Sequence, residues 1–259
     1  GIPSLIQEQN GFAGLTNKKL GGRVQKICVA YEGMERFFPA DKIVMTGNPI
    51  RGIIVPATRE MKEAGVKEYG LDPSRKHIFV VGGSLGSSRF NQCMRKWISD
   101  GCPGIDGVDV LWQCGKYYKK GVDEFMAEQK ARNPEVLRHV HHTDFVGRME
   151  LAYAVADVVV SRSGASSVSE LCAAHKAVIF VPSPNVAEDH QTHNAMALVR
   201  KDAALIVKDA DAMEKMIPTA LDLLKDEARI AALEENAGKM ALPDAAGKIA
   251  EEVYKLIKD

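Results

Sequence analysis

From Lys76 onward the sequence alternates short apolar runs, rich in Val and Ile, with longer segments of helical pattern. Runs of this kind, bounded by Gly, Pro or Ser, suit parallel strands that are covered on both faces. The expected strands are His77–Val81, Val108–Gln113, Arg138–Val146, Asp157–Ser161, Ala177–Pro182 and Ala204–Val207. One helical segment carries an apolar stripe, formed by Phe90, Cys93, Met94, Trp97 and Ile98. The alternation predicts an α/β fold with a doubly wound parallel sheet and ligands beyond the carboxyl ends of its strands.

The composition narrows the possible functions. Lys plus Arg and Asp plus Glu number 34 each, so the charge balance predicts no nucleic-acid partner. No run approaches the ~18 consecutive apolar residues of a membrane-spanning helix, so any membrane contact is expected to be peripheral. The five cysteines are scattered without a C-x-x-C pair, which indicates free thiols in a reducing cytoplasm rather than disulfides or a metal site.

The first fifty residues differ from the rest of the chain. They contain an expected strand within residues 1–9, a helix around Ala13–Leu20 and two short apolar runs, Lys26–Ala30 and Lys42–Met45. The turn residues Gly47-Asn48-Pro49 predict a domain boundary near residues 47–52. Fifty residues are too few to close an α/β domain, and the chain starts without an initiator Met. We therefore expect residues 1–50 to be the C-terminal part of a larger domain whose beginning is absent.

The rest of the chain divides into one domain, residues 51–242, and a terminal helix, residues 243–259. Asp244 is the expected N-cap of this helix. Its expected apolar face consists of Ile249, Val253, Leu256 and Ile257. The sequence pattern leaves open which of the two domains the helix covers.

The first segment with candidate chemistry is the glycine-rich run Gly82–Ser88, between an expected strand and an expected helix. Glycine lets the backbone approach a phosphate closely, and the helix start offers unpaired N–H groups with a partial positive charge. The simpler interpretation is a strand–helix turn in which a serine caps the helix. The segment by itself is compatible with both.

The second segment, Arg162–Glu170, also joins an expected strand to a helix. Ser167 and Glu170 fit the S-x-x-E capping box, which stabilises a helix by ~1 kcal/mol and needs no ligand. Alternatively, the helix N-terminus faces a pyrophosphate, and Glu170 accepts hydrogen bonds from ribose hydroxyls, since a carboxylate offers only acceptors. The spacing alone does not decide between the two.

The third segment comprises Pro182–Pro184 and the polar run Glu188–Asn194, again past the end of an expected strand. Its amides and carboxylates suit either a surface that reads sugar hydroxyls or a solvated loop. His190 and His193 have the i, i+3 spacing of metal ligands but no evident third ligand, so we expect neither a metal nor a cofactor.

Two further groups are interpreted as structural. Glu8–Gly11 is a turn after the first strand when taken in isolation. The histidines His139, His141 and His142 lie near a strand, where alternation would place the first two on one face and the third on the other.

Taken together, five segments resemble, in order and spacing, the MurG family of glycosyltransferases: EQNGFAGLTNKKL, GNPIR, VVGGSLGSSRFNQ, ADVVVSRSGASSVSEL and EDHQTHNA. The resemblance covers essentially the whole chain. It implies the GT-B fold, in which two Rossmann-like domains face each other. Residues 1–50 would then belong to the acceptor and membrane side, residues 51–242 would bind the UDP-sugar, and the terminal helix would pack back on the N-terminal domain.

The resemblance implies transfer of N-acetylglucosamine from UDP-N-acetylglucosamine to the C4 hydroxyl of the muramyl sugar in lipid I. The product would be lipid II, formed with inversion at the anomeric carbon. The partners would be the UDP-sugar, the lipid-linked acceptor and the cytoplasmic face of the bacterial inner membrane. No bound metal would be needed, because N–H dipoles and Arg51 can stabilise the charge on the departing UDP.

The resemblance also implies roles for single residues at the nucleotide. Val146 would present its backbone to the uracil, and Glu170 would hold the ribose hydroxyls. Ser84 and Arg51 would contact the diphosphate. The helix start that faces the diphosphate would consist of Ala165, Ser166, Ser167, Val168 and Ser169.

At the sugar, Gln191 and His190 would read the hydroxyls, and Asn10 would reach them from the other domain. His190 stands where the family often has Gln. Family members also begin with a Gly-rich loop and a His proposed as the catalytic base, and this chain lacks that region. No catalytic base is therefore assigned, and we expect the chain as given to bind the donor weakly and to turn over poorly.

The basic stretch Ala13–Lys26 contains Lys18, Lys19, Arg23 and Lys26 and no acidic residue. Beside an anionic leaflet each such charge contributes ~1 kcal/mol, so the stretch predicts membrane contact; the alternative is a solvated, charged helix.

Two alternative functions remain. The chain could be the donor-binding subunit of a split glycosyltransferase, or another GT-B enzyme such as a glycolipid synthase or a UDP-N-acetylglucosamine 2-epimerase. The EQNG and GNPIR segments favour the peptidoglycan enzyme.

Overall fold

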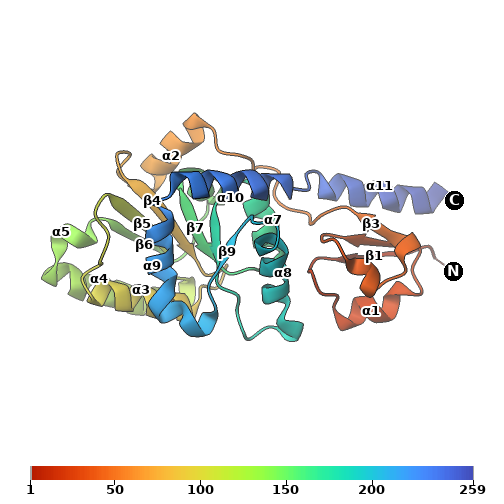
Figure 1. The fold of residues 1–259 in the computed structure, drawn as a ribbon, viewed down its shortest axis with the longest axis horizontal. Coiled ribbons are helices and arrows are strands. Elements are labelled where there is room, and N and C mark those ends of the chain that lie inside the picture. Colours follow the sequence, from red (N-terminus) through yellow and green to blue (C-terminus); the bar gives the residue numbers. More distant parts are fainter. Residues whose placement is uncertain (1, 259) are drawn as a thin grey trace.

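The computed structural model describes residues 2–258 and contains two separate parallel sheets (Figure 1). The smaller sheet has the order β1–β2–β3, with strands β1 (Leu5–Glu8), β2 (Lys26–Val29) and β3 (Ile43–Met45). The larger sheet has the order β6–β5–β4–β7–β8–β9, with strands β4 (Lys76–Val81), β5 (Val108–Gln113), β6 (Val140–Thr143), β7 (Val158–Ser161), β8 (Val178–Phe180) and β9 (Leu205–Ile206). All neighbouring strands are parallel, which confirms the predicted α/β class.

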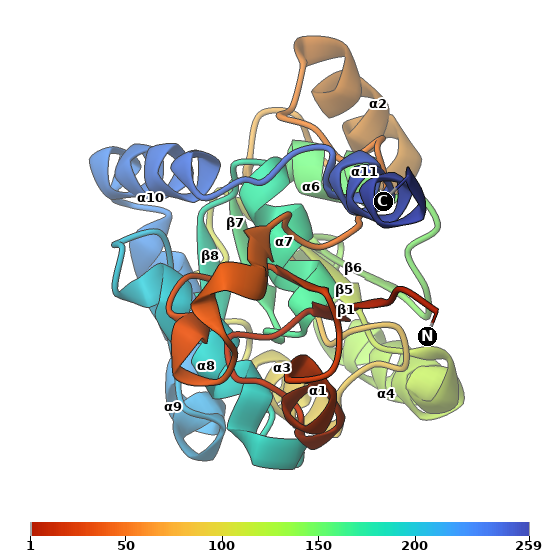
Figure 2. The ribbon, with the colours of Figure 1, turned by 90° about the vertical axis from the view of Figure 1, so that its right-hand side faces the viewer.

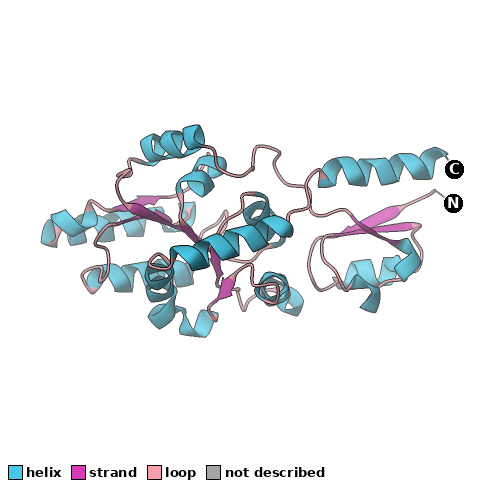
Figure 3. Ribbon diagram, turned by 45° about the horizontal axis from the view of Figure 1, so that its top comes forward, coloured by secondary structure: helices cyan, strands magenta, loops and turns pink. Residues whose placement is uncertain are grey.

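Helices connect the strands and lie on both sides of the larger sheet (Figure 3). They are α1 (Leu15–Gly21), α2 (Arg59–Tyr69), α3 (Ser88–Ser99), α4 (Lys119–Arg132), α5 (Pro134–Leu137), α6 (Met149–Val155), α7 (Ala165–Ala173), α8 (His190–Val199), α9 (Ala212–Leu223), α10 (Glu227–Lys239) and α11 (Ala245–Lys258). Short 3-10 turns are η1 (Met34–Arg36), η2 (Ala40–Lys42), η3 (Lys116–Tyr118), η4 (Ala187–Asp189) and η5 (Asp209–Asp211).

The order of the larger sheet creates a switch point between β4 and β7. From β4 the chain moves outward through β5 to β6, then returns to β7 beside β4 and moves outward in the other direction through β8 to β9. The connections after β4 and β7 therefore leave on opposite sides of the sheet and open a crevice between them. In parallel α/β sheets, ligands bind in this crevice, outside the carboxyl ends of the strands.

One expected strand is much shorter than the sequence pattern indicated. β6 extends only over Val140–Thr143 instead of Arg138–Val146. Arg138 is the C-cap of α5, so the first residue of the expected strand belongs to the end of a helix. Pairing with β5 ends at Thr143, and the next residues form the loop that leads to α6.

The larger sheet separates two apolar cores. One face is covered by α3, α4 and α9, and here the predicted stripe of α3 is buried around Trp112. The other face is covered by α6, α7 and α8 around Phe79 and Phe180. These three aromatic side chains are fully buried. Burying one large apolar side chain stabilises a fold by about 1.5–3 kcal/mol, so the two cores hold the sheet rigid beneath the crevice.

The smaller sheet has its own core, and α11 lies alongside it (Figure 1). A Cβ on Gly47 would lie 2.7 Å from Leu242, just before α11, which shows how closely the two segments approach. On α11 the expected apolar residues Val253 and Ile257 are exposed, at 40% and 72%. Within residues 2–258 no helix is both long and apolar enough to cross a bilayer.

A buried carboxylate ties the amino-terminal ends of β4, β5 and β6 together. Asp109 is 1% exposed, and its Oδ1 lies 2.7 Å from Arg75 Nε and 2.8 Å from His139 Nδ1. Its Oδ2 accepts from the Asp72 backbone N–H at 2.8 Å. Burial raises the pKa of Asp109, but hydrogen bonds from His141, the Asp72 backbone and His139 outweigh burial and lower this pKa to about 2.

The expected alternation of the histidines is confirmed. His139 and His141 both lie near Asp109, whereas His142 Nε2 lies 2.8 Å from Asp123 Oδ1 on the other side of the strand. The contacts of all three are with neighbouring side chains, in agreement with a structural role.

We predict that Asp109→Asn destabilises the fold at pH 7 by on the order of 2 kcal/mol. The folded-state pKa lies below the ordinary value of 3.8, so the carboxylate stabilises the fold above about pH 4, and this contribution is lost as the pH falls toward 2. Urea unfolding at several pH values measures the free energy of unfolding of both proteins. The difference between variant and wild type should be largest at pH 7 and should shrink below pH 4. The exposed Asp106→Asn is the control, and equal stability of Asp109→Asn and wild type at pH 7 would contradict the prediction.

Candidate functional site

The turns that follow β4 and β7 line one cavity of about 630 Å³ at the switch point. Gly82–Ser88 forms one wall, and Arg162 and Gly164 form another. The remaining lining residues come from the start of α7, the loop after β8, α8 and η5: Ser166, Ser167, Ser183, Pro184, Asn185, Gln191 and Asp209, with Arg89 and Gln92 from α3. The first two segments singled out from the sequence therefore meet at one cavity, and the third contributes only Ser183, Pro184 and Gln191 to its lining.

The glycines of the first turn serve different purposes. Gly86 has φ of +78°, and a Cβ there would lie 2.3 Å from the Cys114 carbonyl oxygen. Gly115, with φ of +92°, faces it, so the turns after β4 and β5 pack backbone against backbone. Gly83 has φ of +92° but no neighbouring atom within 4 Å of a Cβ position. Packing within the protein thus explains why residue 86 is a glycine. At Gly83 no protein atom would meet a Cβ, so the space beside this residue is open.

Arg162, to which the sequence analysis gave no role of its own, supports the same wall, and its side chain is 12% exposed. Arg162 Nη1 lies 2.6 Å from Asp209 Oδ1, and its Nη2 donates to Ser87 Oγ at 3.0 Å. The Ser87 hydroxyl in turn accepts from the Phe90 N–H at 3.3 Å, so Ser87 is the N-cap of α3, as the simpler interpretation of this turn expects. Arg89 Nε lies 3.2 Å from Asp209 Oδ2. Two cations and one carboxylate at the wall leave it net positive.

Of the two interpretations that the sequence left open for Ser167 and Glu170, the capping box is not formed. α7 begins at Ala165 with Gly164 as its N-cap, so Ser167 lies inside the first turn. Gly164 has no side chain to accept from the first N–H groups of the helix, which remain without a side-chain cap. Because uncapped N–H groups and the helix dipole favour an anion, this end of α7 can hold a phosphate group.

Glu170 lies one turn further along α7 and is held by two partners. Arg51 Nε and Nη2 both donate to its Oε1 at 3.0 Å. The Tyr153 hydroxyl donates to its Oε2 at 3.3 Å. Arg51, which the resemblance places at the diphosphate, is therefore paired with the carboxylate expected at the ribose.

The loop after β1 contacts α8 through the buried amide of Asn194. Asn194 Nδ2 donates to Asn10 Oδ1 at 3.0 Å and to the Ser163 carbonyl at 3.1 Å, and its Oδ1 accepts from the Gly11 N–H at 2.8 Å. Asn48 Nδ2 donates to Ser169 Oγ on α7 at 3.1 Å and to the Gln9 carbonyl in the loop after β1 at 2.9 Å. Figure 2 shows the smaller sheet in front of α7 and α8, where these contacts lie. They bring Asn10 to the edge of the site, near the loop that follows β7.

The expected sugar-reading residues lie at the start of α8. Gln191 Oε1 accepts from the Ser183 N–H at 2.8 Å, and the Gln191 carbonyl accepts from Ser163 Oγ at 2.8 Å. Gln191 lines the cavity, with its amide nitrogen left for a ligand. His190 Nε2 lies 3.4 Å from Glu188 Oε2 and is not among the residues lining the cavity.

Two expected contacts with the nucleotide lie at different depths. Ser84 is exposed at the tip of the first turn and lines the cavity. Val146 is buried in the core that α6 and α7 cover, in the loop after β6, so only its backbone could meet a ligand. The backbone role assigned to Val146 is compatible with this position.

Histidine side chains near the site do not form a metal site. Among residues 2–258 no group of three or more His, Cys, Asp or Glu side chains is placed to hold a metal ion. The His193 ring stacks on Phe12 with ring centroids 4.8 Å apart, and the His190 ring lies 6.4 Å from the same Phe12 ring, with its Nε2 3.4 Å from Glu188 Oε2.

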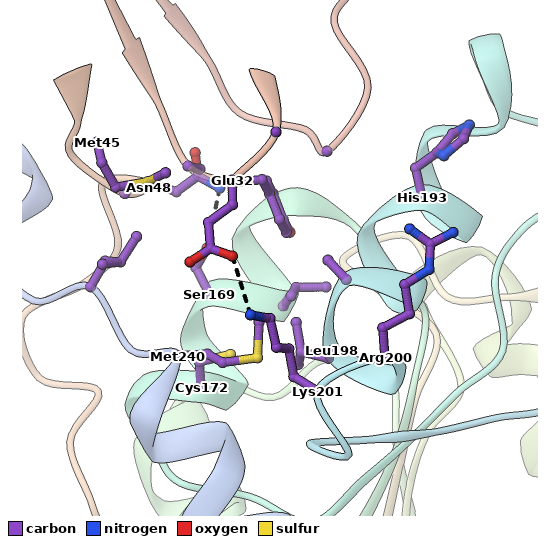
Figure 4. Close-up of a pocket in the computed structure, with 18 of the residues that line it drawn as sticks. Glu32, Met45, Asn48, Ser169, Cys172, His193, Leu198, Arg200, Lys201 and Met240 are labelled. Carbon is purple, nitrogen blue, oxygen red and sulfur yellow. Dashed lines mark hydrogen bonds and ion pairs between the residues drawn. The ribbon is translucent and has the colours of Figure 1, made fainter. Parts of the chain in front are cut away.

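A second cavity, of about 690 Å³, lies against another side of α7, between the smaller sheet and helices α8 and α10 (Figure 4). Its walls combine apolar side chains with the cations of Arg200 and Lys201. Lys201 Nζ lies 3.3 Å from Glu32 Oε2, which joins the two units across it. Its lining includes neither the turn after β4 nor that after β7. Although it is slightly larger, it lacks the anion-binding turns of the first cavity, which is therefore the candidate site.

Comparison with known proteins agrees with this geometry. The glycosyltransferase family 28 C-terminal domain matches residues 77–249. The UDP-N-acetylglucosamine--N-acetylmuramyl-(pentapeptide) pyrophosphoryl-undecaprenol N-acetylglucosamine transferase of Bacteroides thetaiotaomicron is 48% identical over 99% of this chain and 67% of its own length. The protein of the same name from Flavobacterium psychrophilum is 43% identical over 100% of this chain and 67% of its own length. The chain thus spans about two thirds of the length of these relatives.

Solved structures are similar as well. The crystal structure of Acinetobacter baumannii MurG has a TM-score of 0.73 and 26% identity, covering 98% of this chain and 67% of that one. A glycosyltransferase from Rickettsia africae has a TM-score of 0.64 at 14% identity, over 98% of this chain and 71% of its own. At that identity the second likeness shows only a shared fold.

We predict that Gly86→Ala destabilises the protein by about 1–3 kcal/mol, because a Cβ would meet the Cys114 carbonyl in a left-handed backbone conformation. Thermal unfolding should show a lower Tm than wild type. Gly52→Ala is the control, since its Cβ would have no neighbour within 4 Å and its φ is not positive. An unchanged Tm for Gly86→Ala would contradict the close packing of the two turns.

Proposed function

The chain belongs to glycosyltransferase family 28, in its MurG family, and from this premise we propose that it holds the UDP-N-acetylglucosamine donor for transfer to lipid I. The resemblance seen in five sequence segments is thereby confirmed. The product of the complete reaction is lipid II, formed by attack of the C4 hydroxyl of the muramyl sugar on the anomeric carbon. The single observation that carries the proposal is that the turns after β4 and β7 line one cavity.

In this proposal the diphosphate lies between the Gly82–Ser88 turn and the uncapped start of α7. Both offer backbone N–H groups, and the helix dipole adds a partial positive charge. Arg51 is close enough to α7 to change partners from Glu170 to the diphosphate. Glu170 then accepts hydrogen bonds from the ribose hydroxyls, and the Val146 backbone meets the uracil.

The sugar lies toward α8. Gln191 directs its amide to the hydroxyls, with His190 beside it and Asn10 approaching from the smaller sheet. Residues 1–50 form the acceptor-side unit in this arrangement, residues 51–242 the donor-binding domain, and residues 243–259 the helix that returns to the first unit. The position of α11 beside the smaller sheet supports this division.

The chemical contribution of these residues is to stabilise the leaving group. As the bond to the anomeric carbon breaks, negative charge grows on the diphosphate. N–H groups already fixed by the fold stabilise that charge without reorganising, which lowers the barrier by about 3–4 kcal/mol for a single good donor. The acceptor hydroxyl also needs a base within hydrogen-bond reach, and we assign none of the described residues to that role.

The alternatives are weaker in light of the relatives. Identity of 48% over 99% of the chain to a named lipid-linked sugar transferase argues against a glycolipid synthase or an epimerase. No observation on the described residues favours a split, non-catalytic subunit.

We further propose that α1 approaches an anionic membrane from the cytoplasmic side. It exposes Leu15, Lys19 and Leu20, and the exposed Arg23 follows it in the chain. Lys18 is not available for this contact, because its Nζ lies 4.1 Å from the centre of the Phe12 ring and 3.7 Å from Glu188. The basic stretch therefore divides into a membrane-facing part and a cation that contacts the larger unit.

Binding of nucleotides by calorimetry tests the donor assignment. We predict that UDP-N-acetylglucosamine binds more tightly than UDP or UDP-glucose, that GDP does not bind, and that a chelator changes nothing. Gln191→Ala should reduce the advantage of UDP-N-acetylglucosamine over UDP by about three- to tenfold while leaving UDP affinity unchanged, since one hydrogen bond is lost. Equal or tighter binding of GDP would overturn the assignment.

Charge reversal tests the membrane contact. The double substitution Lys19→Glu and Arg23→Glu should weaken sedimentation with phosphatidylglycerol vesicles by about tenfold or more, because each charge near the surface contributes ~1 kcal/mol. Added salt should reduce wild-type binding, and phosphatidylcholine vesicles should bind little. Reversing Lys120 and Lys130 on α4 is the matched control. Unchanged binding of the first variant would refute the contact.

A further inference from the structure

Tyr153 contacts Glu170, the carboxylate that we propose to bind the ribose. Tyr153 lies in α6, is 3% exposed and packs edge-on against Phe79, with ring centroids 6.1 Å apart. Its hydroxyl donates to Glu170 Oε2 at 3.3 Å. Burial and the nearby Glu170 charge both raise the pKa of Tyr153 well above its ordinary value, so the hydroxyl keeps its proton and remains a donor.

The two partners of Glu170 differ in how easily they can move. The Arg51 side chain is 49% exposed and contacts Oε1 from the solvent side. Tyr153 is enclosed by the core and contacts Oε2 from the protein side. A ligand can therefore displace Arg51, whereas Tyr153 can leave Glu170 only if the core rearranges.

We propose that Tyr153 is a positioning residue for ribose recognition, holding Glu170 Oε2 so that Oε1 faces the ribose hydroxyls once Arg51 turns to the diphosphate. The inference rests on the proposed function, because it requires a nucleotide at the switch-point cavity. Without Tyr153, Glu170 would lose its last fixed partner when Arg51 leaves. The carboxylate would then be free to rotate, and ordering it again would weaken binding.

A purely structural role predicts a different result. If the hydrogen bond to Glu170 only compensates for the burial of the Tyr153 hydroxyl, removing the hydroxyl lowers the stability of the protein and changes the affinity for all nucleotides by the same factor. A positioning role affects only nucleotides that carry the ribose hydroxyls. The two roles can be distinguished by removing a ribose hydroxyl from the ligand and the tyrosine hydroxyl from the protein, singly and together.

The experiment compares UDP, 2′-deoxy-UDP and 3′-deoxy-UDP by calorimetry on wild type and Tyr153→Phe. Wild type should bind at least one deoxy nucleotide about tenfold more weakly than UDP, as expected for a lost hydrogen bond to a carboxylate. Tyr153→Phe should bind UDP about five- to tenfold more weakly and the deoxy nucleotides as wild type does, so that discrimination falls to within about twofold. Full discrimination in Tyr153→Phe would overturn the inference.

Two further variants keep the outcomes distinct. In a Glu170→Gln background, Tyr153→Phe should cause no further loss of discrimination, because the positioned carboxylate is already gone. Tyr69→Phe removes a hydroxyl that donates to the Arg148 carbonyl at 2.8 Å, away from the cavity, and should leave nucleotide binding unchanged. If wild type binds UDP without discriminating against either deoxy nucleotide, the ribose role of Glu170 fails. If UDP does not bind at all, the proposed function itself fails.

Discussion

The parallel pairing of β4 with β7 is the constraint from which the candidate site follows. Val81 pairs with Ser161, so both strands end at the same level and their following turns start side by side. One connection covers one face of the sheet and the other the opposite face, which separates α3 from α7 and leaves a crevice between them. Nothing about a ligand is needed for this arrangement. It results from the strand order alone, and the polar turns then give the crevice its chemistry.

The walls of the crevice are fixed by interactions that do not involve a ligand. Gly86 packs on Gly115 through backbone atoms, and Arg162 joins the Ser87 cap to Asp209. Preorganised donors are worth more to an anion than mobile ones, because no reorganisation is needed when the charge arrives.

The sequence predicted the features that depend on the pattern within one element, but not those that depend on contacts between residues far apart in the chain. The strands and the stripe of α3 depend on residues within one element, so their pattern was sufficient to locate them, although β6 spans only Val140–Thr143 of the expected Arg138–Val146. The spacing of Ser167 and Glu170 left two interpretations of the start of α7 open, because a capping pattern is short; the helix begins at Ala165, after the extended backbone of Gly164. The contacts of Arg162 with Asp209 and of Tyr153 with Glu170 join residues 47 and 17 positions apart. Only the packed fold brings such pairs together, and no local motif marks them.

The two ends of the proposed site depend on different parts of the fold. The diphosphate end is built mainly from the turns after β4 and β7 and the start of α7, whose positions the two cores determine, and Arg51 adds a cation from the segment between β3 and α2. The sugar end also needs Asn10, which is held by the buried Asn194 amide across the junction of the two units. Leaving a buried amide without a hydrogen-bond partner costs about 1–3 kcal/mol. A rotation of the smaller sheet that separates Asn10 from Asn194 is therefore unfavourable unless the Asn194 amide finds new partners. Nucleotide affinity should therefore be insensitive to the orientation of the two units, whereas sugar recognition should follow it closely.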